Sequence, residues 1–232
     1  MTKVAAGITT SLDGYITGLN DGPGRGLGDG GERLHYWVFG GPWSYQEEAR
    51  GEPTGADKQF LDEGIARVGA VIGGRNTYEA AGAWGGSNPF GVPFFILTHR
   101  PQEAPEGAGF TFVNGLEEAI TQAREAAGGK DVFIMGGADV IRQALRGGHV
   151  EELSISIAPV VLGGRQAPVR RLRPVGGPGA RTGAPVAVRH PHHLPRGALT
   201  REETGMGDDR DRERDAEEQE EGPQVSDEEG LP

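Results

Sequence analysis

Apolar runs and helical repeats of apolar residues alternate along most of this chain. Short β-branched or apolar runs predict strands at 3–10, 70–73, 92–98, 110–113, 131–135 and 152–161. Apolar residues at helical spacing predict helices at 57–68, 76–81, 116–127 and 138–145. Strands that alternate with helices need crossover connections, so the pattern predicts an α/β fold with a mainly parallel central sheet flanked by helices.

Two segments break this alternation near the N-terminus. Residues 18–31 contain seven glycines and Pro23, a composition that holds no regular element and is typical of a flap over a site. Residues 35–39 are aromatic, which favours a short helix or a wall of a cleft. We expect His35 to be packed within this aromatic patch rather than to do chemistry.

The composition changes after residue 164. All fifteen aromatic residues lie in 1–164, and 165–232 contains no Phe, Tyr, Trp, Ile or Lys. A segment without large apolar side chains cannot offset the entropy that ordering costs. We therefore predict a folded domain over 1–164 and a low-complexity, disordered tail over 165–232. His190, His192 and His193 lie in that tail, and we expect no metal site there.

Charge and composition exclude several classes of function. Residues 1–164 hold 12 basic and 20 acidic residues, a balance of −8, and the tail accounts for the remaining −3 of the net charge of −11. This acidity argues against a nucleic-acid partner. With no cysteine there is no disulfide, thiolate metal site or cysteine nucleophile. No apolar stretch approaches the roughly 18 residues of a membrane span, so we expect a cytoplasmic protein without a membrane partner.

Two glycine pairs carry the chemistry that the sequence suggests most clearly. Gly73-Gly74 and Gly136-Gly137 each end an apolar run and precede a predicted helix. Such a turn brings backbone N–H groups against a phosphate, because glycine has no Cβ to block the approach. Arg75 follows the first pair, and its planar guanidinium suits a second phosphate. NADPH is therefore the predicted ligand, against the simpler alternative of tight turns beside a surface cation.

Five motifs in a fixed order connect these turns to a known family. They occupy 11–16, 74–77, 97–100, 133–137 and 158–164. Together they resemble the dihydrofolate-reductase-like family, in the branch similar to the C-terminal reductase domain of the bacterial riboflavin-biosynthesis deaminase/reductase. The resemblance covers about residues 2–164. It implies a mixed sheet of about eight strands and an NADPH-dependent reductase resembling 5-amino-6-(5-phosphoribosylamino)uracil reductase.

The resemblance also implies which residues hold NADPH. In the turn after the second strand, Arg75 matches the arginine that meets the adenosine 2′-phosphate and Thr77 the threonine that meets the pyrophosphate. The turn after the third strand completes the 2′-phosphate pocket, and the second glycine pair lets the pyrophosphate touch the backbone. The predicted cofactor residues are Gly73, Gly74, Arg75, Asn76, Thr77, Thr98, His99, Arg100, Gly136, Gly137, Ala138 and Asp139.

Hydride transfer also needs a proton for the product, so we sought a carboxylate in the cleft. Asp13 lies where the first strand leaves the sheet, and Asp57 opens the helix that carries the substrate-facing acid in related reductases. We predict both in the site without choosing between them. Their alternative roles are a turn former for Asp13 and a helix cap for Asp57.

The partner that we expect is a small molecule, with a homodimer as a possible assembly. No zinc-deaminase motif accompanies the reductase motifs, which favours a stand-alone reductase acting on a small heterocycle or ribosylamine. Two alternatives stay open. One is reduction of dihydrofolate itself, and the other is a protein that binds the nucleotide without catalysis because its C-terminus is altered.

The tail departs from the pattern that the resemblance implies, which continues into a helix and a closing hairpin. Residues 165–199 instead hold seven arginines, six prolines, three histidines and no acidic residue. A GC-rich gene translated in a shifted frame has this composition. Our hypothesis is a frameshift near codon 164, and resequencing codons 160–170 tests it, since an intact frame there refutes it.

Overall fold

Seven parallel strands form one sheet in the computed structural model, which describes residues 2–22, 24–45, 51–100, 107–163 and the backbone of 186–189. The spatial order of the strands is β4-β3-β2-β5-β1-β6-β7. Their bounds are β1 Val4–Thr10, β2 Val68–Gly74, β3 Phe94–Leu97, β4 Phe110–Val113, β5 Asp131–Gly136, β6 Glu152–Ile157 and β7 Val186–Arg189. All described neighbours pair in parallel, so the mainly parallel sheet is confirmed, and no antiparallel member of a mixed sheet lies among them.

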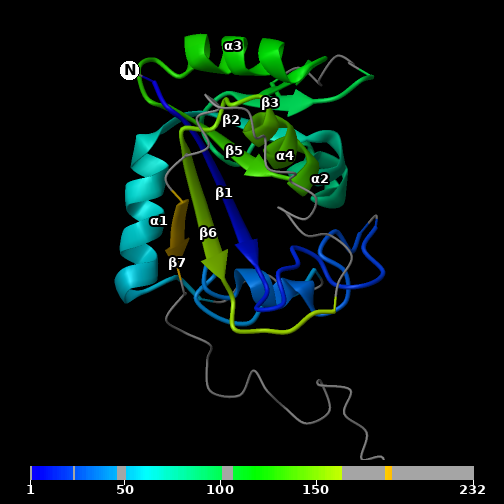
Figure 1. Cartoon of the computed structure of the whole chain (residues 1–232). Helices are drawn as coiled ribbons and strands as arrows, with labels where there is room; N and C mark the ends of the chain where they lie inside the picture. The colour runs from blue at the N-terminus through cyan, green and yellow to red at the C-terminus, as the bar shows by residue number, and fades with distance from the viewer. Residues whose placement is uncertain (1, 23, 46–50, 101–106, 164–185, 190–232) are drawn as a thin grey trace, which may run out of the picture. The chain divides into compact units, whose positions relative to one another are not determined.

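Four α-helices connect the strands at the places that the sequence pattern predicts (Figure 1). They are α1 Gly55–Arg67, α2 Arg75–Ala80, α3 Leu116–Ala126 and α4 Ala138–Arg146. Two short 3-10 helices, Gly31–His35 and Gly82–Gly86, add turns that the sequence leaves undefined. The predicted α/β class with helices beside a central sheet is therefore confirmed.

The last strand corrects one prediction. Val186–Arg189 lies in the segment predicted to be disordered, yet it pairs with β6, from Leu153 opposite Val186 to Ser156 opposite Arg189. Pairing at an open edge needs only backbone hydrogen bonds, which four residues with two valines can supply. The rest of the predicted tail, with His190, His192, His193 and the junction at codon 164, lies outside the described residues.

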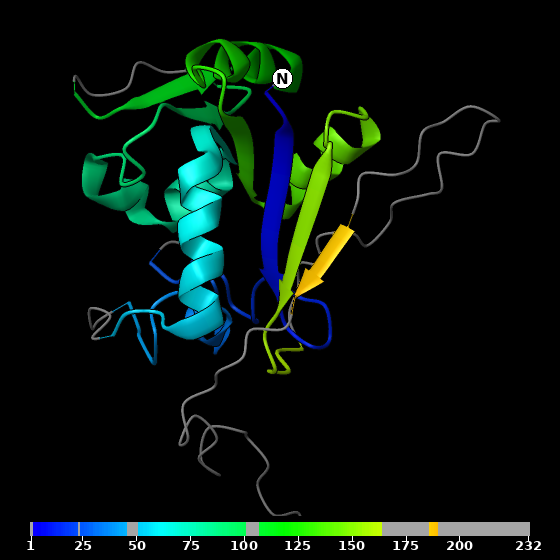
Figure 2. The same ribbon diagram turned by 90° about the vertical axis from the view of Figure 1, so that its left-hand side faces the viewer.

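Both faces of the sheet carry an apolar core. Side chains of β2 alternate, so that Ile72 joins the cluster under α3 and α4 while Val71 joins the cluster on the opposite face. The first cluster is built from small residues of the helices, such as Ala119, Ala123 and Ala144, which lets the helices approach the strands closely. Figure 2 shows α1, the long cyan helix, lying along the length of the sheet.

The opposite face is aromatic. Tyr78 of α2, Trp84, Phe94 and Phe110 lie with ring centroids 5.2–6.3 Å apart. Edge-to-face and stacked contacts of this kind add stability beyond the area that they bury. Because Tyr78 belongs to α2, this cluster fixes the helix that follows the first glycine pair.

Register places the two glycine pairs side by side. All the strands run in one direction, so their carboxyl ends share one edge of the sheet, where ligands of open parallel sheets bind. Gly73 of β2 lies opposite Gly136 of β5, and Gly74 lies opposite Leu97 of β3. Three turns that are far apart in the sequence therefore meet at this edge.

We expect Gly73→Ala to destabilise the fold. A Cβ at Gly73 would lie 2.9 Å from the Cε2 atom of Phe94, a side chain that is 1% exposed. Overpacking of this kind costs about 1–3 kcal/mol of unfolding free energy, measurable by urea denaturation. Gly41→Ala, at a glycine with open space around it, is the control and should change little. Equal stability of the two variants would contradict the packing role of Gly73.

Candidate active site

Ten of the twelve predicted cofactor residues line one small cavity of about 270 Å³ at the carboxyl edge of the sheet. They come from three turns, those after β2, β3 and β5, which close around the same space. The lining residues that were predicted are Gly74, Arg75, Asn76, Thr77, Thr98, His99, Arg100, Gly137, Ala138 and Asp139. Leu97, Gly115, Val140 and Gln143 complete the described lining.

Two glycines of this lining make room for neighbouring side chains of the protein. A Cβ at Gly74 would lie 2.9 Å from Cγ2 of Val140, so its absence lets α4 pack against the end of β2. A Cβ at Gly137 would lie 3.2 Å from Oγ1 of Thr77, so it would crowd the hydroxyl that faces the turn. The peptide bond between Gly136 and Gly137 is cis.

Arg75 is held in place at one wall of the small cavity. Its Nε donates a hydrogen bond of 2.6 Å to Oε1 of Glu79, one helical turn further along α2. Its guanidinium also lies over the ring of Phe112, 5.6 Å from the ring centroid. A guanidinium fixed by a carboxylate and a ring keeps its remaining N–H donors oriented, which favours recognition of a phosphate.

The turn after β3 forms another wall. Thr98 is buried, and its Oγ1 accepts a hydrogen bond of 3.1 Å from the backbone N–H of Arg100. His99 and Arg100 are exposed beside it. The buried hydroxyl therefore fixes the turn while the two basic side chains stay accessible.

The first and third of the four glycines differ from the prediction. Gly73 lines neither cavity, because its place is under the ring of Phe94 within the core. Gly136, with φ of 131°, lines the larger cavity described below rather than the small one. The missing Cβ of Gly73 makes room for the ring of Phe94, and the positive φ of Gly136 allows the turn.

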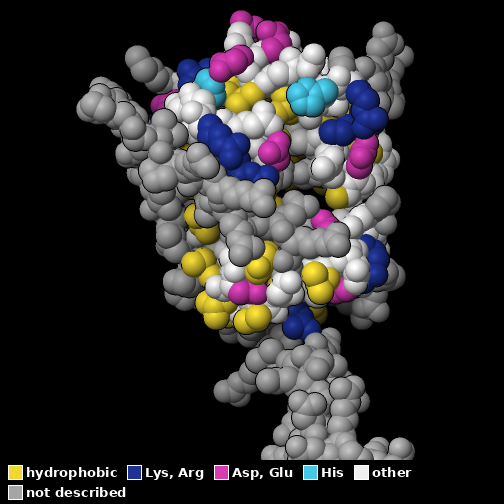
Figure 3. Space-filling view, turned by 45° about the vertical axis from the view of Figure 1, so that its right-hand side comes forward, with side chains coloured by type: hydrophobic (Ala, Val, Ile, Leu, Met, Phe, Trp, Pro, Cys, Tyr) yellow, Lys and Arg dark blue, Asp and Glu magenta, His cyan; other side chains and the backbone are white. Residues whose placement is uncertain are grey.

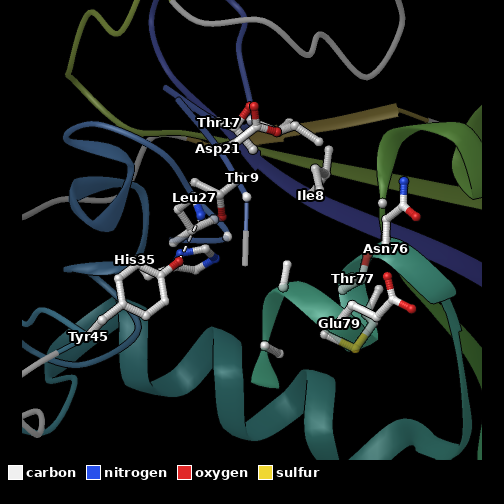
Figure 4. Close-up of a pocket in the computed structure, with 18 residues that line it drawn as sticks. Ile8, Thr9, Thr17, Asp21, Leu27, His35, Tyr45, Asn76, Thr77 and Glu79 are labelled. Atoms are coloured by element: carbon white, nitrogen blue, oxygen red, sulfur yellow. Dashed lines mark hydrogen bonds between the residues drawn. The ribbon is translucent and has the colours of Figure 1, made fainter. Parts of the chain in front are cut away.

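A larger cavity of about 740 Å³ adjoins the small one. Asn76, Thr77 and Gly137 line both, so the two spaces meet at the turns after β2 and β5. Figure 4 shows His35 and Tyr45 on one side of the larger cavity, with Asn76, Thr77 and Glu79 on the opposite side. The surface is hollowed on this face of the molecule, with both acidic and basic side chains around the hollow (Figure 3).

The glycine-rich segment forms a wall of this larger cavity. Gly26 packs against Ala80 of α2, where a Cβ on the glycine would lie 2.6 Å from that of the alanine. The loop is tied together by a hydrogen bond of 2.7 Å from the N–H of Gly18 to the carbonyl of Leu27, and by Asp29, which pairs with Arg25. As predicted, its described residues up to Gly30 hold no helix or strand, and it reaches the end of α2.

His35 also lines the larger cavity, in keeping with the wall of a cleft that was one alternative for residues 35–39. Burial lowers the pKa of its imidazole to about 4, so the ring is neutral at pH 7. Its edge faces Trp43, with 6.4 Å between the ring centroids, and Trp43 packs in turn on Tyr45. The hydroxyl of Tyr45 accepts a hydrogen bond of 2.7 Å from the N–H of Leu27 (Figure 4). An aromatic cluster thus joins His35 to the glycine-rich loop.

Comparison with known proteins places this geometry in a family. The sequence matches the RibD C-terminal domain over residues 2–189. The chain belongs to that family. The resemblance given by the five motifs is therefore confirmed, and the match continues past residue 164 as far as the end of β7.

Individual relatives of this RibD C-terminal domain are distant. A candidate riboflavin biosynthesis protein of Shewanella sp. PV-4 is 27% identical, with a TM-score of 0.50 over 72% of this chain and 82% of its own. The uncharacterized protein YwjB of Bacillus subtilis is 27% identical over 124 residues, which are 53% of this chain and 68% of YwjB. Dihydrofolate reductase of Enterococcus faecalis, solved with NADP(H), is 18% identical with a TM-score of 0.46 over 71% of this chain and 76% of its own.

Asp13 of this RibD C-terminal domain does not face either cavity. Its carboxylate is exposed and accepts hydrogen bonds of 3.1 and 2.8 Å from the N–H groups of Leu162 and Gly163. Burial would raise the pKa of Asp13, but hydrogen bonds from the Ser11 hydroxyl and from these two N–H groups hold it below its ordinary value. Asp13 therefore ties the segment after β1 to the segment after β6, a long-range contact that neither the catalytic nor the turn-forming prediction describes.

Asp57 is also absent from the described lining of both cavities. It is buried in the first turn of α1, a helix that begins at Gly55. The carboxylates that do line the larger cavity are Asp21, from the glycine-rich loop, and Glu79, from α2. Asp21 lies in the segment predicted to be a flap and Glu79 in the helix after the first glycine pair, but no motif distinguishes either carboxylate from its neighbours.

A last observation concerns membranes. In the part of the chain that the structure describes, no helix has both the length and the apolar character that crossing a bilayer requires.

We expect His35 to make stability depend on pH. Its folded pKa of about 4 lies below the ordinary 6.5, so between these values the unfolded chain binds the proton more readily. Unfolding free energy should therefore fall as the pH is lowered from 6.5 to 4, by up to about 3 kcal/mol. Urea denaturation at pH 7, 5.5 and 4.5 measures it. His35→Gln should flatten this dependence, and an unchanged slope would contradict a buried neutral ring. His99→Gln, at an exposed histidine, is the control.

Proposed function

We propose that this protein is an NADPH-dependent reductase that transfers a hydride to a small heterocyclic or ribosylamine substrate. One observation carries the proposal. Three separate turns, chosen from the sequence as NADPH ligands, line a single cavity that opens into a larger one through Asn76, Thr77 and Gly137. Adjoining cavities suit an elongated cofactor whose phosphates lie in one and whose reactive ring meets a substrate in the other.

The residues of the small cavity suit the phosphates of NADPH. Gly74 and Gly137 leave the backbone accessible where side chains would intrude, and the hydroxyl of Thr77 lies between them. Arg75 and Arg100 supply positive charge for a 2′-phosphate. Asp139 also lines the cavity, but its carboxylate is hydrogen-bonded by Gln143 at 2.7 Å and by Arg142 at 3.4 Å, which offsets its repulsion of an anion.

The larger cavity has the character of a reaction chamber. When bound, NADPH supplies a hydride from its nicotinamide ring. The apolar side chains of Ile8, Ile16, Leu27 and Met135 line the cavity and reduce its water content, which strengthens the polar contacts inside. Asn76 and Thr77 contribute to both cavities and so orient whatever spans them.

Proton delivery to the product falls to a carboxylate of the larger cavity. Glu79 accepts a hydrogen bond of 2.6 Å from Arg75, so its carboxylate is already engaged by a residue of the small cavity. Asp21 extends from the glycine-rich loop into the cavity beside Thr17 (Figure 4). We assign the proton to Asp21 in place of Asp13 and Asp57, because a proton donor must reach the reacting atom directly or through one water.

Arg75→Gln should weaken NADPH binding and leave NADH binding nearly unchanged. Loss of a charge-assisted contact to the 2′-phosphate costs roughly tenfold to hundredfold in affinity. Quenching of tryptophan fluorescence by each nucleotide gives the two dissociation constants. Arg124→Gln, at an arginine paired with Glu151, is the control and should bind both nucleotides like the parent chain. An equal effect of Arg75→Gln on both nucleotides would refute the 2′-phosphate role.

Asp21→Asn should lower kcat while leaving the dissociation constant of NADPH unchanged. General acid catalysis contributes roughly a hundredfold to ten-thousandfold, so a loss of at least a hundredfold is expected. Loss of NADPH absorbance with a panel of reducible heterocycles, dihydrofolate included, measures turnover. Asp13→Asn should keep kcat and lose stability. If a folded Asp13→Asn variant shows no turnover while Asp21→Asn stays active, Asp13 is the proton donor and the assignment to Asp21 is wrong.

A further inference from the structure

Positive charge is divided unequally between the two cavities. The smaller one is lined by Arg75 and Arg100. Among the described residues that line the larger one there is no lysine or arginine, and its charged groups are the carboxylates of Asp21 and Glu79. The one imidazole in that lining belongs to His35, whose pKa burial lowers to about 4, so it adds no positive charge at neutral pH.

A phosphate in the larger cavity would therefore lack a counter-charge. Taking a phosphate out of water is costly unless cations or several N–H donors replace its hydration. The carboxylate of Asp21 adds no positive charge to the lining, and that of Glu79 already holds the guanidinium of Arg75 at 2.6 Å. The guanidinium of Arg75 is held by Glu79 and by the ring of Phe112, and of the two cavities Arg75 lines the smaller one.

The polar groups of the larger cavity are uncharged hydrogen-bonding groups. Nδ1 of His35 and Oγ1 of Thr17 are buried without a hydrogen-bond partner in the described structure. A buried polar atom left without a partner costs about 1–3 kcal/mol, and such atoms in folded proteins are commonly completed by a ligand or a water. The hydroxyl of Tyr45 lies next to His35 and keeps its proton to donate.

We infer that the larger cavity takes a substrate without a phosphate, a neutral nitrogen heterocycle with or without an attached sugar, hydrogen-bonded by His35 and Thr17. This inference rests on the proposed reductase and narrows its substrate. It separates the protein from a reductase of a phosphoribosylamine, because the 5-phosphate of such a substrate would meet carboxylates and neutral groups. His35 acts as a neutral partner of the heterocycle, and its ring is held for that role by Trp43.

A matched pair of probes tests this. The full chain, saturated with NADP⁺ so that no turnover occurs, is titrated calorimetrically with 5-amino-6-ribosylaminouracil and with its 5-phosphate. We expect the phosphate-free probe to bind at least tenfold more tightly. Equal or tighter binding of the phosphate overturns the inference, and so does binding of neither probe when NADP⁺ binds. If NADP⁺ itself does not bind, the proposed reductase fails, and the same titration without nucleotide still decides the preference.

Variants of residues that line the larger cavity test whether these residues cause the preference for the phosphate-free probe. Asp21→Lys places a cation in the lining and should tighten binding of the 5-phosphate at least tenfold, whereas Asp62→Lys, at an exposed position of α1, should not. His35→Phe should weaken binding of the phosphate-free probe at least tenfold, and His35→Asn, which keeps a polar atom near Nδ1, should restore most of it. NADP⁺ affinity reports whether each variant is folded. Unchanged probe binding by a folded His35→Phe overturns the role of His35.

Discussion

Backbone pairing between β2 and β5 holds this site together. The register sets Gly73 opposite Gly136, and β3 on the other side of β2 sets Leu97 opposite Gly74. Because the described strands all run in parallel, the three turns that follow them emerge at one edge. A shift of this register by one residue would turn every side chain of β2 to the other face and separate the two glycine turns. Arg75, Thr77 and Gly137 share a cavity only in this register.

The core maintains that register from both sides. Small residues of α3 and α4 bring these helices close to the sheet, and the bare Cα of Gly74 lets α4 approach the end of β2. On the opposite face, Tyr78 of α2 packs on Phe110 and Phe112, and Gly73 makes room for the ring of Phe94. Packing and the proposed phosphate recognition therefore depend on neighbouring glycines in the same turn, so a substitution that alters one is expected to alter the other.

The division of charge follows from the same arrangement. Arg75 lines the small cavity, and its guanidinium is held by Glu79, one turn along α2, and by the ring of Phe112. Facing the larger cavity, α2 presents Asn76, Thr77 and Ala80, while the glycine-rich loop and the aromatic cluster add Leu27, His35 and Tyr45. One short helix thus contributes to a compartment lined by arginines and to a compartment whose described charged side chains are carboxylates. The two compartments suit different parts of a reduction, anchoring of a charged cofactor and contact with an uncharged heterocycle.

The sequence alone determined the alternation of strands and helices and ten of the lining residues of the small cavity, because those residues stand in contiguous turns next to strands whose apolar runs are unmistakable. Tertiary structure decided the rest. It placed Gly73 against the ring of Phe94, and it placed the carboxylate of Asp13 where it accepts hydrogen bonds from the N–H groups of Leu162 and Gly163. It also paired β7 with β6 at the edge of the sheet. It also brought His35 and Asp21 to the larger cavity. These positions depend on contacts between segments distant in the chain, which local pattern does not encode.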